Sequence, residues 1–361
     1  MSTQRFRQGR RARRVLLWSG LAFVCAQLGF GLLLDSCWQR LRFPQAAAIL
    51  AEARQLAVQP DLVCLGSSRL GVAFRPFELS EQLRRQSGRD DVVAFNACIE
   101  AGDTLTSEFM LNQLLAEGVR PRLVIVEVSP ETLAERNAWM HLHVDRQLRW
   151  QDLPDVWLDV WRSRNGPRLL ATRLLPLHAY RREIKATLVR YVPAVRLSSK
   201  KRGNSVDTEP TPLPFVDTLR IAGRTDRSLP PWEKRQIWLQ LVRNWLRDYR
   251  LGGSAGRALD RLVARCQQEG IEVVLLGAPV AASHRDLYTP AVEGQFQACM
   301  ARLTALPGCT FVDWRAEFED EFFVDNHHLF REGALEFTTR LARWFGSDMF
   351  AQASAKRAPR P

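Results

Sequence analysis

Short apolar runs alternate along the chain with longer segments in which apolar residues recur at helical spacing. The apolar runs, each bounded by turn residues, span residues 62–65, 92–95, 123–128, 273–276 and 310–312. Strands that are apolar on both faces are typical of a parallel sheet covered by helices on both sides. The helix-like segments span residues 76–86, 104–117, 255–269, about 290–306 and about 333–345.

The order of these elements predicts the fold class. Strand and helix alternate, an interruption follows the third strand, and the alternation then resumes to the end. This order predicts an α/β fold, a three-layer α/β/α sandwich with a parallel sheet of about five strands, built from residues 35–130 and 254–348. Such a domain places its chemistry at the carboxyl ends of the strands. Residues 349–361 follow it as a tail.

The interruption, residues 131–253, has a different composition. It contains seven of the eleven tryptophans and a polar segment at 198–214, which we expect to be a flexible loop. The rest is predicted to be mostly helical, with a helix over 231–249. The apolar stripe of that helix either packs against the main domain or forms a lid that touches a membrane or a partner. The stripe comprises Trp238, Leu241, Val242, Trp245 and Tyr249.

The N-terminus predicts a membrane anchor. Residues 1–14 carry six arginines and no acid, and residues 15–34 form an uncharged apolar stretch of twenty residues. Twenty helical residues span about 30 Å, the thickness of a hydrocarbon core. We expect a single-pass inner-membrane protein with a cytoplasmic basic head, because arginines stay inside, and a periplasmic or extracellular domain. Cleavage, or lipidation at Cys37 in the sequence Leu-Asp-Ser-Cys, is the alternative.

The net charge of +12 first suggests a nucleic-acid binder. Half of the charge lies in the basic head, and without it 45 − 39 leaves only +6, with no concentrated basic segment. We therefore expect no nucleic acid among the partners. The seven cysteines include no C-x-x-C pair. Cys64 and Cys98 lie in apolar surroundings and are predicted to be small buried hydrophobes, whereas Cys299 and Cys309 would bridge only in an oxidising compartment.

Two distant segments together suggest nucleophilic catalysis. Gly66-Ser67-Ser68 follows the first predicted strand, and a D-x-x-H pattern, Asp325 to His328, precedes the last predicted helix. A serine hydroxyl needs a neutral imidazole to take its proton and a carboxylate to orient that imidazole. Alone, each segment is more typical of a turn or a helix cap. His141, His143 and Asp145 would share one face of an extended strand, but without a fourth ligand we expect no metal site there.

These segments resemble the SGNH/GDSL hydrolase superfamily over about residues 61–345, without the insertion. The resemblance implies a Ser-His-Asp triad and no cofactor. The second block, from Asn96 to Gly102, also resembles the family, which implies that the Gly102 amide joins that of Ser68 as an oxyanion donor. The resulting site comprises Ser68, His328 and Asp325 as the triad, with Ser67, Arg69, Asn96 and His327 near the substrate and His327 as the competing base.

The third block departs from the hydrolytic members. Most of them carry an asparagine after the third strand, where this chain has Glu127-Val128-Ser129-Pro130-Glu131, and Asn137 is the nearby substitute. This ending resembles membrane-tethered extracytoplasmic branches, including relatives of the teichoic-acid D-alanine transfer protein and the alginate O-acetylation proteins. That resemblance implies that the domain works beside a multispanning membrane acyltransferase and acts on an acylated envelope polysaccharide or a small ester.

Two functions from different classes follow. The first is a serine esterase or O-acyltransferase that acts on a cell-envelope glycan or related ester. The second is a catalytically degenerate domain that binds an envelope polymer or scaffolds a membrane-bound acyltransferase. The absent third-block asparagine and the tryptophan-rich insertion motivate the second.

Overall fold

Five parallel strands form the central sheet of the protein, in the order β2-β1-β3-β4-β5. The computed structural model describes residues 2–36, 39–135, 140–162, 164–191 and 231–347. The strands are β1 (Leu62–Leu65), β2 (Ala94–Asn96), β3 (Leu123–Val128), β4 (Glu272–Gly277) and β5 (Cys309–Asp313). The register places Leu62 beside both Ala94 and Leu123. The predicted fold class is confirmed.

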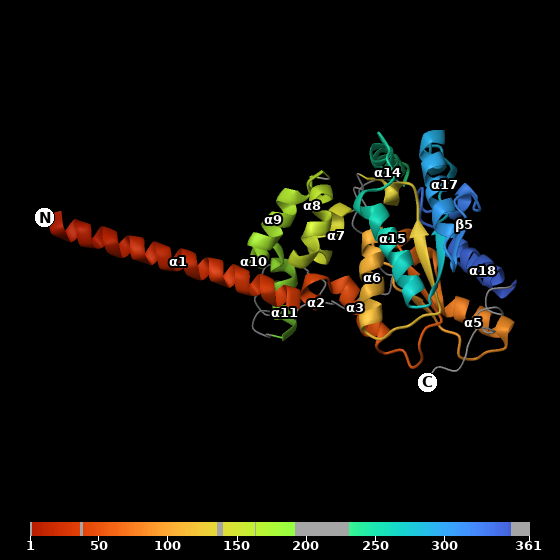
Figure 1. The fold of residues 1–361 in the computed structure, drawn as a ribbon, viewed down its shortest axis with the longest axis horizontal. Coiled ribbons are helices and arrows are strands. Elements are labelled where there is room, and N and C mark those ends of the chain that lie inside the picture. The colour runs from red at the N-terminus through yellow and green to blue at the C-terminus, as the bar shows by residue number, and fades with distance from the viewer. Residues whose placement is uncertain (1, 37–38, 136–139, 163, 192–230, 348–361) are drawn as a thin grey trace.

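The two faces of the sheet bury alternate residues of each strand, as the pleat requires. On one face Val63, Val124 and Val273 pack under four helices: α3 (Pro44–Ala53), α6 (Thr104–Ala116), α15 (Gly253–Gln268) and α17 (Pro290–Thr304). On the other face Leu62 and Ile125 pack under α4 (Ser68–Ala73), α5 (Pro76–Ser87) and α18 (Arg331–Ser347). The chain is therefore a three-layer α/β/α sandwich (Figure 1).

Local sequence signals set where several of these helices begin and end. The side chain of Asp103 caps α6 by accepting the Thr106 N–H at 2.9 Å. Proline occupies the first turn of α5 and α17, where no amide donor is needed. Gly88 ends α5 with a left-handed φ of 67°, a conformation that glycine adopts without strain.

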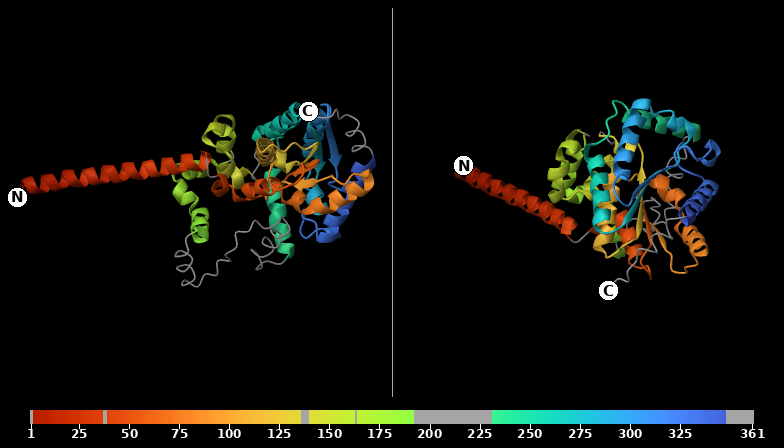
Figure 2. Two further views of the ribbon diagram at one scale, coloured as in Figure 1. Left: turned by 90° about the horizontal axis from the view of Figure 1, so that it is seen from below. Right: turned by 45° about the vertical axis from the view of Figure 1, so that its right-hand side comes forward.

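A long helix, α1 (Ser2–Ser36), extends away from the sandwich, as Figures 1 and 2 show. Among the described residues, Arg13–Ser36 is the helical stretch long and apolar enough to cross a membrane, with mean hydropathy 1.8. Only 11% of its most apolar window is buried inside the protein. A signal sequence or a buried core helix would also meet the test of length and composition.

The described part of the insertion is helical. It begins with η1 (Glu131–Leu133), which directly follows β3 and contacts α15. The next group lies around the end of α1 and comprises α7 (Met140–Gln147), η2 (Trp150–Asp152), α8 (Leu153–Arg162), α9 (Gly166–Leu174), α10 (Pro176–Ala179) and α11 (Arg181–Tyr191). Helix α14 (Pro231–Trp245) lies apart from that group and contacts α16 (Ala282–Arg285). The remaining short helices are α2 (Gln39–Arg42) and η3 (Asp320–Phe322). Cys37, Asn137, the loop at 198–214 and the tail from 349 lie outside the described residues.

Two sequence expectations can be compared directly with the structure. Cys64 and Cys98 are buried as predicted, with their sulfurs 3.7 Å apart, whereas Cys299 and Cys309 are both free thiols. Residues 141–145 lie in helix α7 rather than in an extended strand, and positions two residues apart do not share a face of a helix. His143 instead stacks on Phe43 and hydrogen-bonds the Glu100 carbonyl.

The close approach of β1 and β3 depends on Gly66, the residue directly after β1. A Cβ atom at Gly66 would lie 2.7 Å from the Cβ of Glu127 and 2.7 Å from its Oε2. Glu127 belongs to β3 and is 4% exposed, so that it has little room to withdraw. The sheet therefore requires glycine at the point where the chain leaves β1.

We predict that Gly66→Ala destabilises the protein by about 1–3 kcal/mol, because the buried neighbour must shift. Gly294→Ala is the matched control, since Gly294 lies inside α17 and a Cβ atom there would meet nothing within 4 Å. That change should stabilise by about 0.5–1 kcal/mol. Thermal melting of the full-length protein in detergent measures both, and equal melting temperatures for the two variants would contradict the prediction.

Candidate active site

The candidate site lies at the carboxyl end of β1, where the order of the strands reverses direction. Strand β1 has β2 on one side and β3 on the other, so the chain after β1 and the chain after β3 leave the sheet on opposite faces. A crevice between such divergent connections is where doubly wound sheets bind ligands. The Gly-Ser-Ser turn, the segment after β3 and the loop that precedes α18 meet there.

Ser67 fixes the turn that begins α4. Its hydroxyl accepts the Arg69 N–H at 3.1 Å, so that Ser67 is the N-cap of the helix. Both its N–H and its O–H donate to the carboxyl group of Glu127, at 2.7 and 2.9 Å. These contacts hold Ser67 with 1% of its surface exposed and place Ser68 as the first residue of α4. The N–H of Ser68 has no acceptor within its own helix, as is general for a first turn.

Ser68, His328 and Asp325 form a continuous chain of hydrogen bonds. The Ser68 Oγ lies 2.9 Å from Nε2 of His328, and Nδ1 of the same ring lies 2.8 Å from Oδ2 of Asp325. A carboxylate at Nδ1 accepts its proton and leaves Nε2 with the lone pair that accepts the serine O–H. The structure thus brings together the three residues that the sequence suggested as a triad. Their catalytic roles belong to the proposal below.

The loop that carries the histidine is closed like a small hairpin. Phe323 and Leu329 form an isolated antiparallel bridge, and the Val324 N–H donates to the His328 carbonyl at 2.8 Å. At its tip, Oδ1 of Asp325 accepts the backbone N–H groups of both His327 and His328 at 2.8 Å. Burial opposes the charge of Asp325, but the two imidazoles and these hydrogen bonds outweigh it and hold its pKa far below the ordinary range.

His327, the competing base, is directed elsewhere. Its Nδ1 lies 2.8 Å from Oδ1 of Asn326, which makes Nδ1 the protonated nitrogen. Its ring is 4% exposed and meets the edge of Trp238 from α14 at a centroid distance of 5.1 Å. Burial lowers the pKa of His327 well below its ordinary value. The hydroxyl of Ser68 therefore bonds with His328 and not with His327.

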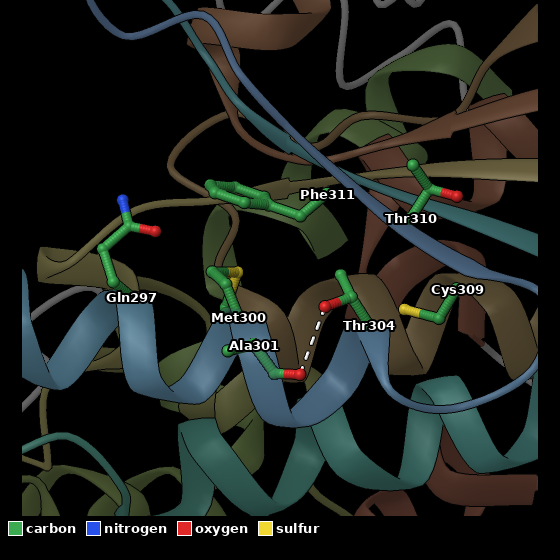
Figure 3. A pocket seen from close by; sticks show the side chains of 7 residues that line it. All are labelled: Gln297, Met300, Ala301, Thr304, Cys309, Thr310 and Phe311. Atoms are coloured by element: carbon green, nitrogen blue, oxygen red, sulfur yellow. Dashed lines mark hydrogen bonds between the residues drawn. The ribbon is translucent and has the colours of Figure 1, made fainter.

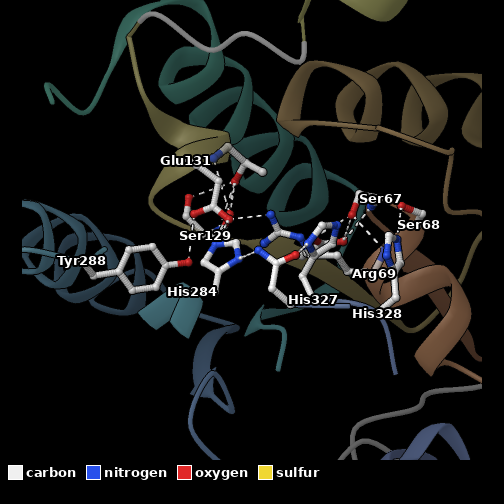
Figure 4. A network of polar contacts seen from close by, with 12 residues as sticks. Ser67, Ser68, Arg69, Ser129, Glu131, His284, Tyr288, His327 and His328 are labelled. Carbon is white, nitrogen blue, oxygen red and sulfur yellow. Dashed lines mark hydrogen bonds and ion pairs between the residues drawn. The ribbon is translucent and has the colours of Figure 1, made fainter. Parts of the chain in front are cut away.

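A buried polar network adjoins the triad, as Figure 4 shows, and no sequence pattern anticipated it. Glu131 is its centre. One oxygen of this carboxylate lies 2.6 Å from Nη2 of Arg69 and 3.2 Å from Nε2 of His284, and the other accepts the Tyr288 hydroxyl at 3.0 Å. The Asn326 amide nitrogen lies 3.4 Å from Nδ1 of His284 and connects this network to the histidine loop.

The charges of Arg69 and Glu131 compensate each other within this network. Burial opposes ionisation of both Arg69 and Glu131, yet their mutual attraction prevails, so that the pKa of Glu131 is well below and that of Arg69 above its ordinary value. Burial lowers the pKa of His284, because the charged ring would lose its hydration there, and this outweighs the hydrogen bond to Glu131, which acts in the other direction. In the sequence, the one signal for this network is that Arg69 directly follows Ser68. The partners of Arg69 lie far away along the chain, so the sequence does not connect them with it.

The remaining predicted site residues have other contacts. The N–H of Gly102 donates to the Ile99 carbonyl at 2.8 Å, so an oxyanion would have to compete for it. The Asn96 amide nitrogen donates to the Gly71 carbonyl at 2.8 Å and holds the end of α4. In the third block, the hydroxyl of Ser129 bonds with Thr132. The substrate contacts expected of Ser67, Arg69, Asn96 and His327 stay predictions.

Two other features of the described residues resemble binding sites, one for a metal ion and one for a small molecule. Ligand atoms of Asp325, His327 and His328 lie within 4.8 Å of one another, as a metal site requires, but His328 already uses both ring nitrogens in hydrogen bonds. A hollow of about 390 Å³ lies between α17 and β5 (Figure 3). It contains none of the triad residues, being lined by Gln297, Met300, Ala301, Thr304, Cys309, Thr310 and Phe311.

Comparison with known proteins gives the chain a distant structural neighbour and no family. No protein-family model matches it, and no curated protein matches it. A solved structure described as "a putative platelet activating factor from Streptococcus pneumonia" aligns over 92% of this chain and 98% of that one, with 11% identity and a TM-score of 0.36. A likeness at this level does not assign an activity.

We predict that Glu131→Gln destabilises the protein by about 3–5 kcal/mol, because it leaves the Arg69 charge buried without its partner. Glu117→Gln is the control. Glu117 pairs with Arg54 at the surface, where the loss of an ion pair costs about 0–1 kcal/mol. Chemical denaturation of the full-length variants measures both, and a Glu131→Gln protein as stable as the control would contradict the buried pair.

We also predict that the protein loses stability as the pH falls below about 6.5, and that His327 causes part of this loss. The pKa of its native ring is lowered, so between that pKa and the unfolded value of about 6.5 the unfolded chain binds a proton that the native chain does not. Stability therefore rises with pH across this window and levels off above it. The pKa values of Asp325 and Glu131 are also lowered, but carboxylates lose their contribution only at lower pH, below about 4.5.

Melting temperatures measured between pH 5 and pH 8 test this prediction. The variant His327→Asn keeps a donor near Asn326 and removes the titrating ring, so its melting temperature should depend less on pH than that of the wild type. The control His178→Asn removes an exposed imidazole in place of the buried one. Identical slopes for all three proteins would exclude His327 as the source.

Proposed function

We propose that this protein is a membrane-anchored serine esterase or O-acyltransferase of the SGNH type. The hydrogen-bonded chain from Ser68 through His328 to Asp325 carries the proposal. A serine between a strand end and a helix start, with an imidazole on its hydroxyl and a half-buried carboxylate behind the imidazole, is the arrangement that nucleophilic catalysis needs. Its place at the reversal of strand order supports the same conclusion.

The reaction would proceed by acyl transfer through Ser68. His328 Nε2 takes the hydroxyl proton while Oγ attacks the ester carbonyl, and the resulting imidazolium is stabilised by Asp325. The tetrahedral intermediate collapses when His328 returns the proton to the leaving alcohol, which leaves an acyl-serine. Water completes hydrolysis, and a sugar hydroxyl completes O-acyl transfer, by the reverse sequence of proton movements. The Ser68 N–H, at the first turn of α4, is the nearest candidate oxyanion donor.

The substrate class and location rest on the sequence. The apolar span of α1, with arginines before it, would hold the domain on the outer side of an inner membrane. The resemblance of the third block to membrane-tethered branches favours an acylated envelope polysaccharide as substrate. It also favours a multispanning membrane acyltransferase as partner. No cofactor takes part in this chemistry.

A specific observation favours a second candidate, a binding or scaffolding domain without turnover. The Gly102 N–H is engaged with Ile99, and Glu127 and Ser129 occupy the block where hydrolytic members have an asparagine. Such a site would have few donors for an oxyanion. Polymer acylation that persists in cells carrying Ser68→Ala would favour this candidate.

Reaction with a fluorophosphonate probe tests the catalytic proposal. We expect the full-length protein to be labelled, Ser68→Ala to be unlabelled, and His328→Ala to react at least about 10³-fold more slowly, as triads lose activity when a member is removed. The adjacent histidine provides the matched control, because His327→Ala leaves the bond between His328 and Ser68 in place. Equal labelling of wild type and Ser68→Ala would remove Ser68 from its role, and loss of labelling only in His327→Ala would reassign the base.

A further inference from the structure

The last turns of α1 are packed against the insertion, although they belong to the apolar span. The side-chain oxygen of Gln27 accepts the N–H of Leu177 in α10 at 3.2 Å. One turn later, Gly31 faces Pro176, whose Cγ lies 3.7 Å from where a Cβ would be. Leu34 is 2% exposed and packs with Tyr180. Helix α10 therefore lies along the side of α1 and not beyond its end.

This packing fixes the depth of α10 relative to the span. Gln27 lies nine residues before Ser36, where the span Arg13–Ser36 ends, and nine helical residues rise about 13 Å. If α1 crosses a bilayer, as the proposed function requires, the start of α10 lies below the outer end of the apolar span. An unpaired amide is costly in hydrocarbon, and the bond from Leu177 satisfies the side-chain oxygen of Gln27 at that depth.

The side chains around α10 match an apolar environment. Leu174, Leu175 and Leu177, at the junction of α9 and α10, expose 56%, 40% and 37% of their surface. Leu28 and Leu32 of α1, the helix that contacts both α9 and α10, are also exposed. Exposed apolar residues beside a candidate span are typical of segments that lie in a membrane interface.

Charged residues beside this surface fit the adjacent headgroup layer. Helix α11 exposes Arg181, Arg182 and Lys185. Basic residues next to apolar ones strengthen contact with lipid phosphates. At the end of α1, Asp35 forms ion pairs with Arg42 at 3.0 Å and with Arg173 at 2.7 Å, which join α1 to α2 and α9.

We propose that α9, α10 and α11 form a collar around α1 that is seated in the lipid bilayer. Leu174, Leu175 and Leu177 enter the apolar layer, and the basic residues of α11 lie among the headgroups. The occupant of this surface is lipid, because α10 packs along the side of α1 at the level of Gln27 and Gly31, which lies within the depth of the span. The proposal deepens the proposed function, on whose membrane anchor it rests.

Spin labels on the full-length protein in nanodiscs test the collar. The native Cys25, exposed on α1, reports on the span itself. In a Cys25→Ser, Cys37→Ser background, Leu174→Cys and Leu177→Cys report on the collar. Phe77→Cys is the matched control, because Phe77 is an exposed apolar residue, 74% accessible, on α5 at the far side of the domain from α1. Unchanged melting temperatures verify that each variant is folded.

The readout is the ratio of collision rates with oxygen, which concentrates in lipid, and with a neutral nickel chelate, which stays in water. We expect a ratio at positions 174 and 177 several-fold higher than at 77 and close to that at Cys25. If the ratio at positions 174 and 177 equals that at position 77 while Cys25 is still in lipid, the collar proposal is wrong and the membrane anchor is retained. Labels at 174 and 177 that neither reagent reaches indicate a covering protein and also overturn it. A water-exposed Cys25 overturns the anchor and the collar together, and fluorophosphonate labelling tests the chemistry separately.

Discussion

Two buried carboxyl groups at the end of β3 hold the residues on either side of Ser68, and the geometry of the site depends on them. Glu127 receives the N–H and hydroxyl of Ser67, and Glu131 pairs with the guanidinium of Arg69. With both neighbours fixed beneath the surface, the serine between them starts α4 with its hydroxyl toward His328. The glycine at 66 is part of the same constraint, since any side chain there would displace Glu127.

The opposite wall of the site has a comparable anchor in Asp325. This carboxylate accepts two backbone N–H groups of its own loop and the Nδ1 proton of His328, so one group sets the fold of the loop and the tautomer of the ring. The adjacent histidine, His327, has its Nδ1 proton on Asn326 instead. Two neighbouring imidazoles thus differ in partner and burial, and only His328 meets the serine. The two walls are joined through Asn326 and His284, which link the histidine loop to Glu131.

The sequence predicted the sheet because apolar runs such as 123–128 are buried on both faces and admit few other structures. It also paired Gly-Ser-Ser with D-x-x-H, since both segments flank strand or helix ends that a parallel sheet brings to one edge. The network of Arg69, Glu131 and His284 escaped prediction because its members come from three separate segments, and burial of a charge is not visible in a linear pattern. Residues 141–145 were misleading for another reason: so short an alternation of polar residues fits an extended strand and a helix equally, and the structure has a helix there, with His143 stacked on Phe43.

The proposed chemistry requires that Ser68 carries an acyl group during turnover. The most direct measurement is mass spectrometry of peptides from full-length protein quenched with acid after incubation with the small ester p-nitrophenyl acetate. Acyl transfer through the triad predicts that an acetyl group accumulates on Ser68 in the wild-type protein. The same peptide of Ser68→Ala should stay unacetylated. Acetyl groups found only on other residues, or found equally in both proteins, would contradict it.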